Sequence, residues 1–88
     1  MFDFKQFAGL SFVAEGDLWA PERTGDYSTD CATGRRHAAE LIEFMHQSGN
    51  APIFGSVIRR ITEKGQFDGV ETGFCAQFGI TLLGAVAS

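Results

Sequence analysis

The stretch DCATGRRHAAELIEFMHQ, residues 30–47, fits the pattern of an α-helix over its whole length. Ser28 or Thr29 can cap its first turn, and Gly49 can close its last turn in the left-handed conformation. Its apolar residues recur every three or four positions and therefore line one face: Cys31, Ala38, Leu41, Ile42 and Met45. This segment is expected to be the scaffold on which the rest of the chain packs.

Two residues of this helix have particular packing consequences. Gly34 lies on the apolar face, where a missing side chain allows another element to approach closely. Phe44 projects away from that face, among polar side chains. It either packs in a second layer or is offered to a partner, and packing is the more common fate of a large aromatic side chain.

A second amphipathic helix is predicted from Pro52 to Lys64, because proline suits a first turn and apolar residues line one side. Gly65 ends it. Only a short link separates it from the first helix, which predicts a helical hairpin. The two apolar faces are expected to pack directly on each other: Leu41, Ile42 and Met45 against Phe54, Ile58 and Ile61.

The two ends of the chain carry ambiguous patterns. Residues 2–14 and 70–83 satisfy both the helical spacing and the alternation of a strand. We predict helices for both, since Asp3 with Gln6 and Asp68 with Glu71 form capping pairs, but the pattern leaves strand character open. The predicted fold of residues 1–88 is one small all-α domain, a three- to four-helix bundle built on the hairpin.

Residues 15–29 are expected to form an acidic loop that contains the only Trp and the only Tyr. The first 30 residues account for the entire net charge of −4, because acids and bases balance in the remainder. Exposed aromatic rings supply contact area, and carboxylates steer a basic partner. The candidate partner-binding residues are Asp17, Trp19, Glu22, Asp26, Tyr27 and Phe44. In the alternative interpretation, Trp19 folds back to seal the core and the acids are ordinary solvated charges.

Patterns typical of catalysis or cofactor binding are absent from the sequence. Cys31, Cys75, His37 and His46 have no metal-ligand spacing, and the glycines fit no phosphate-binding motif. A catalytic thiol would need one of these histidines beside it in space. We therefore expect no enzymatic activity, no cofactor and no metal.

A second hypothesis is nucleic-acid binding by a helical domain. Its candidate residues come from the two predicted helices of the hairpin: Arg35, Arg36, Arg59, Arg60 and Lys64. The net negative charge argues against it. No secretory signal is visible, and the uncharged stretch 72–88 is short for a membrane span, so a cytoplasmic location is expected.

The function expected from these features is that of a small acidic interaction module. It would act as a regulator or inhibitor of the kind that phages and mobile elements encode, and would bind a protein partner with a basic surface. A structural homo-oligomer is the third hypothesis, since nine Phe in so short a chain favour self-association.

Overall fold

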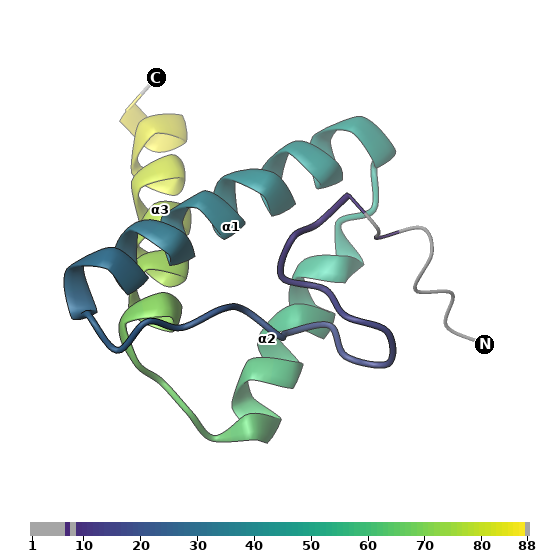
Figure 1. The fold of residues 1–88 in the computed structure, drawn as a ribbon. Helices are drawn as coiled ribbons and strands as arrows, with labels where there is room; N and C mark the ends of the chain where they lie inside the picture. Colours follow the sequence, from purple (N-terminus) through teal and green to yellow (C-terminus); the bar gives the residue numbers. More distant parts are fainter. Residues whose placement is uncertain (1–6, 8, 88) are drawn as a thin grey trace.

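The computed structural model describes residues 7 and 9–87 and confirms the all-α class (Figure 1). The described residues form three helices: α1 (Tyr27–Ser48), α2 (Pro52–Lys64) and α3 (Gly69–Ala87). An extended, turn-rich segment precedes them, and within the described part its only strand-like pairing is an isolated bridge between Ala14 and Asp17. Residues 70–83 are thus helical, and the strand interpretation of that stretch is wrong.

The helix ends follow from local chemistry. Asp26 caps α1 by accepting a hydrogen bond from the Thr29 N–H at 2.9 Å, so the helix begins earlier than the predicted Ser28 or Thr29 cap. Gly49 and Gly65 close α1 and α2 in the left-handed region, with φ of 72° and 69°, as predicted. Glu71 accepts a hydrogen bond from the Asp68 N–H at 2.9 Å, which is one half of the predicted capping box.

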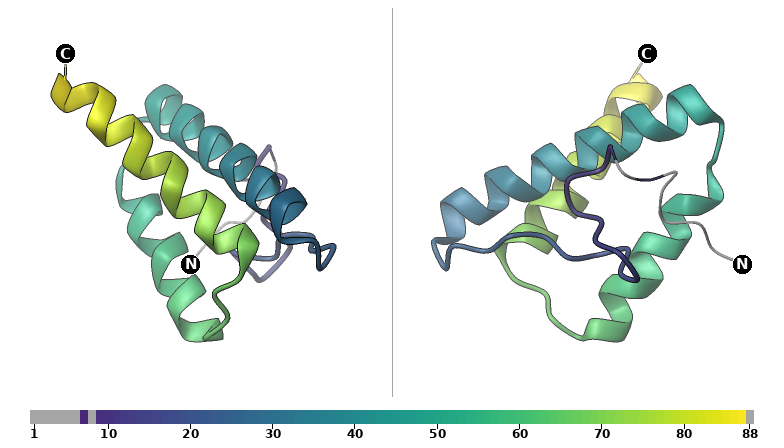
Figure 2. Two further views of the ribbon diagram at one scale, coloured as in Figure 1. Left: turned by 90° about the vertical axis from the view of Figure 1, so that its left-hand side faces the viewer. Right: turned by 45° about the vertical axis from the view of Figure 1, so that its right-hand side comes forward.

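The principal helix contact in the molecule lies between α1 and α3 (Figure 2). At the crossing the two backbones touch. A Cβ atom added at Gly34 would lie 1.9 Å from the Val70 carbonyl oxygen, and one added at Gly73 would lie 2.0 Å from the Cys31 carbonyl oxygen. The close approach predicted at Gly34 is therefore present, and Gly73 of α3 provides the matching gap.

The predicted hairpin contact between α1 and α2 is wrong. These helices are consecutive but make little direct contact. The N-terminal segment bonds to both of them, through Ser11 to Glu40 of α1 and through Asp17 to Arg60 of α2 (Figure 1). Leu41 is nevertheless fully buried in the core. The buried side chains come from all four parts of the chain: Phe7, Leu10, Phe12, Trp19, Ala38, Leu41, Ile53, Val57, Ile61, Val70 and Phe74.

The helix predicted for residues 2–14 is wrong over its described part, while residues 1–6 and 8 lie outside the described residues. Phe7 and Leu10 each accept a backbone hydrogen bond from the residue three positions later, which makes successive turns. Burial of the Phe12 ring against Trp19 and Phe74 explains this path, since a continuous helix could not place both ends of the segment in the core. None of the described helices is long and apolar enough to cross a lipid bilayer.

The crossing predicts an unusual effect of alanine at two glycines. Gly34→Ala and Gly73→Ala each favour helix formation by about 1 kcal/mol, but the added methyl group collides with backbone, and overpacking costs about 1–3 kcal/mol or more. We expect both variants to lose about 2 kcal/mol of unfolding free energy in urea titrations.

Gly55→Ala is the matched control, because Gly55 is also helical and has no atom within 4 Å of its Cβ position. It should be as stable as the wild type or more stable. Equal stability of all three variants would contradict the observed crossing.

Candidate interaction surface

Trp19 lies inside the protein, where it links the N-terminal segment to α3. Its ring is fully buried and packs 4.7 Å, centroid to centroid, from Phe74. The indole Nε1–H donates to a carboxylate oxygen of Glu71 at 2.8 Å. Trp19 is therefore unavailable to a partner in this fold, and the alternative prediction, that it seals the core, is confirmed.

Glu71 is the centre of a buried charged network. Its carboxylate also accepts hydrogen bonds from both terminal nitrogens of the Arg23 guanidinium and from the Asp68 N–H. Burial alone would raise the pKa of Glu71, but the hydrogen bonds from Arg23, Trp19 and Asp68 outweigh it and lower the pKa to about 2. The carboxylate is thus ionised and saturated with donors, which makes it a structural tie between the loop and α3.

Asp17 also has internal partners. It accepts hydrogen bonds from Arg60 Nε at 2.9 Å, from Lys64 Nζ at 2.6 Å and from the Trp19 N–H at 3.0 Å. Burial opposes ionisation, but the bonds from Lys64, Arg60 and Trp19 lower the pKa of Asp17 to about 2. This cluster fastens the loop to α2 and withdraws Asp17 from the proposed partner-binding set.

The other predicted partner-binding residues are scattered. Asp26 is engaged as the cap of α1, whereas Glu22 and Tyr27 are exposed. Phe44 is half-buried and packs edge-on against Phe7 at 5.3 Å, which agrees with the packing alternative. These residues do not form one continuous surface with Trp19, which is enclosed.

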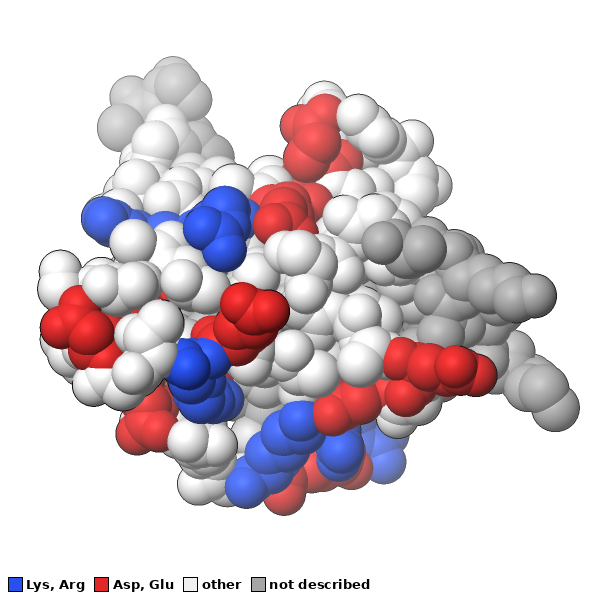
Figure 3. Space-filling model, viewed as in Figure 1, with Lys and Arg blue, Asp and Glu red and all other residues white. Residues whose placement is uncertain are grey.

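The candidate nucleic-acid residues are likewise divided. Arg60 and Lys64 are paired with Asp17, and Arg59 pairs with Glu63 at 3.5 Å. The remaining two, Arg35 and Arg36, are exposed on α1. Figure 3 shows basic and acidic side chains alternating over this face, with no continuous basic patch.

A polar cavity of about 200 Å³ lies beside His37 and is lined by Ser11, Glu22, Thr24, Thr33, Arg36 and His37. The Ser11 hydroxyl lies 3.1 Å from His37 Nδ1 and donates to Glu40 at 2.7 and 2.9 Å. Glu40 accepts from the hydroxyl, and the direction of the contact between Ser11 and His37 depends on the tautomer of the ring. Its other nitrogen, Nε2, is buried without a hydrogen-bond partner among the described residues. Burial lowers the pKa of His37, although Glu40 opposes the shift, so the ring is neutral in the folded state.

The two cysteines are free thiols in different environments. Cys31, on the predicted apolar face of the first helix, is partly buried at the crossing, whereas Cys75 is exposed. Burial and the nearby Glu71 raise the pKa of Cys75, so its thiol is protonated at neutral pH and weakly nucleophilic. Over residues 7 and 9–87, no group of three or more His, Cys, Asp or Glu side chains is positioned to hold a metal ion.

The chain matches none of the family models, curated proteins or solved structures with which we compared it. The candidate site is therefore assigned from geometry alone. The feature of the surface that packing and pairing leave unexplained is the second half of α3.

We call Ile80, Leu82 and Leu83 the α3 tip. Their exposed fractions are 55%, 66% and 71%, and the last charged residue before them, Glu71, is buried a full two turns away. The α3 tip lies beyond the crossing with α1 (Figure 1), and the sequence has no charged side chain over residues 72–88. In Figure 3 the described atoms of this projection are white, that is, uncharged. Single exposed leucines are common, but three large aliphatic side chains on one uncharged helix end make this the candidate interaction surface.

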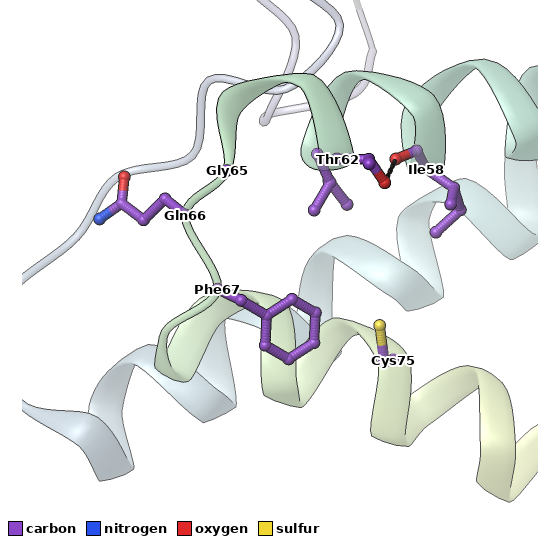
Figure 4. Close-up of a pocket in the computed structure, with 7 residues that line it drawn as sticks. Ile58, Thr62, Gly65, Gln66, Phe67 and Cys75 are labelled. Atoms are coloured by element: carbon purple, nitrogen blue, oxygen red, sulfur yellow. Dashed lines mark hydrogen bonds between the residues drawn. The ribbon is translucent and has the colours of Figure 1, made fainter.

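An apolar groove of about 250 Å³ lies between α2 and the first half of α3, and Cys75 is the residue of α3 that lines it. In Figure 4 the Phe67 ring and the Cys75 thiol face α2 across this groove, and Gln66 points away from it. Phe67 is 61% exposed. The lining residues are Ile58, Ile61, Thr62, Gly65, Gln66, Phe67 and Cys75. This surface was not predicted from the sequence, although the absence of charged residues over 72–88 was the feature that could have indicated it.

The Glu71 network predicts a large stability effect of a nearly isosteric change. Glu71→Gln leaves the Arg23 guanidinium without its carboxylate, and breaking a buried pair costs about 3 kcal/mol or more. Glu63→Gln is the control, because Glu63 pairs with arginines at the surface and such pairs contribute less than about 1 kcal/mol. Urea titrations that gave equal losses for the two variants would contradict the structural role of Glu71.

The environment of His37 predicts a loss of stability in mild acid. Its pKa is lower in the folded protein than in the unfolded chain, so the unfolded state binds more protons as the pH falls below about 6.5. The unfolding free energy should therefore fall between pH 7 and 5.5, before the carboxylates of Asp17 and Glu71 matter.

His37→Gln should flatten this pH dependence, whereas His46→Gln, at an exposed position, should retain it. The measurement is chemical unfolding at several pH values. A flat profile in the wild-type protein would refute the burial of a neutral His37.

Proposed function

We propose that this protein is a non-enzymatic interaction module that binds a protein partner through the α3 tip and the groove between α2 and α3. One observation carries the proposal: three large aliphatic side chains are mostly exposed at the end of a helix that has no charge after Glu71. The solubility of a folded domain is better served by charges at such positions. Exposed aliphatic side chains lower solubility, and this disadvantage disappears when a partner covers them.

The energetics support a role in binding and not in folding. Burying apolar surface contributes about 25 cal/mol for each Å² removed from water. Ile80, Leu82 and Leu83 leave most of their surface in water, so they add little to the stability of this domain. The same surface is available to stabilise a complex, with Phe67 at the other end of the groove adding an aromatic contact.

The acidic loop, residues 15–29, has a secondary role in this proposal. Asp17 and Asp26 are engaged inside the molecule, whereas Glu15 and Glu22 remain exposed. Like charges repel, so these exposed carboxylates disfavour a contact with an acidic surface through the loop and leave the uncharged α3 tip as the docking contact. The proposal thus keeps the interaction module but moves the docking contact from Trp19 to α3.

The test compares two variants with the same added charge. Leu82→Glu with Leu83→Glu places two carboxylates on the α3 tip, and Ala32→Glu with Ala39→Glu places two on exposed positions of α1. Both variants should melt within a few degrees of the wild type. The measurement is the amount of cross-linked complex, either with a partner protein or with a second copy of the chain. We expect the α3 variant to form at least tenfold less of it than the wild type, and the α1 variant to form as much as the wild type.

The proposal would be overturned if both variants formed the same complexes as the wild type. A large loss of melting temperature in the α3 variant alone would also contradict it, because it would assign these side chains to the core.

A further inference from the structure

The outer side of α3 has a self-complementary shape. Cys75, Ala76, Gly79, Leu82 and Leu83 follow at intervals of three or four residues and so lie on one side of the helix. All are exposed. The small side chains and the groove precede Gly79, and the large aliphatic side chains follow it.

We propose that the occupant of this surface is a second copy of the same chain, with the two α3 helices packed antiparallel about a two-fold axis near Gly79. This inference rests on the proposed function and names its partner. Such an axis pairs each residue with the one equally far on the other side of Gly79. Leu83 of one copy then meets Cys75 of the other, and Leu82 meets Ala76. Each large side chain is thereby placed on a small residue beside the apolar groove.

The charge distribution is compatible with a contact between two copies along α3. The chain has a net charge of −4, yet residues 72–88 contain no charged side chain. Two copies that meet along this face bring no carboxylates together, whereas contacts through the N-terminal loop would oppose acids to acids. Glu71, the nearest acid, is buried and paired with Arg23.

The backbone at Gly79 allows the helices to approach closely. No atom lies within 4 Å of the position that a Cβ would occupy there. Inside the molecule, the same device brings α1 and α3 into contact at Gly34 and Gly73. Close approach at Gly79 brings Leu83 of one copy to the rim of the groove of the other, where Ile58, Ile61 and Phe67 supply apolar contacts.

The first experiment measures the mass in solution by light scattering during size-exclusion chromatography over a range of concentrations. The wild type should shift from the mass of one chain toward that of two as concentration rises. Gly79→Arg should remain a monomer at every concentration. Gly55→Arg is the matched control: it adds the same side chain at another helical glycine with open surroundings, and it should dimerise as the wild type does.

The second experiment tests the antiparallel register by disulfide cross-linking in a Cys31→Ser background. Leu83→Cys with the natural Cys75 should give a covalent dimer on mild oxidation. When Cys75→Ser is added, the cross-link should disappear, because the two residues at position 83 would be about 12 Å apart along the axis. A cross-link that persists without Cys75 overturns the antiparallel arrangement.

The outcomes separate this inference from the proposed function. If the wild type stays monomeric and the α3 variant alone loses binding to another protein, the dimer proposal is wrong but the docking surface of the proposed function stands. If the α3 variant changes neither mass nor binding, both proposals fail.

Discussion

The contact on which the rest of this structure depends is the crossing of α1 and α3, where Gly34 and Gly73 let two backbones touch. Helices usually lie 8–10 Å apart because side chains separate them. Here the missing side chains remove that spacing at one point. The N-terminal segment adds Phe7, Leu10 and Phe12 to the buried core. Because α1 makes little direct contact with α2, α2 is held chiefly through other elements, among them the ring contact of its Phe54 with Phe78 of α3 at 4.6 Å.

Charged side chains hold the irregular segment in place. A segment without helical hydrogen bonds needs other partners for its polar groups, and here they are carboxylates. Glu71 binds Trp19 and Arg23, Asp17 binds Arg60 and Lys64, and Glu40 binds Ser11. These ties explain why an acidic front that resembles a binding loop in composition is mostly engaged within its own domain. The composition was informative about which charges are present but not about what they face.

Much of the helical structure could be predicted from the sequence, because it depends on local signals. Gly49 and Gly65 end two helices where the pattern placed the ends, and Gly34 marked a close approach. The pairing of elements could not be predicted, since the apolar face of α1 is compatible with α2, with α3 and with the N-terminal segment. Burial of Trp19 depended on a carboxylate 52 residues later, and no local pattern connects the two. The exposed end of α3 was missed because an uncharged helix resembles a buried one in sequence.

The uneven burial of α3 divides one helix into two regions with different freedom to change. Its first two turns contain Val70, Gly73 and Phe74, all enclosed, where nearly any replacement disturbs the interior. Residues 80–84 are exposed and make little contribution to the interior of the domain. Natural sequences related to this one should therefore vary at the distal end without losing the fold. If the residue types at the distal end were nevertheless restricted among such sequences, the restriction would result from selection for an external contact. Selection for folding and selection for binding would then act on different parts of the same helix.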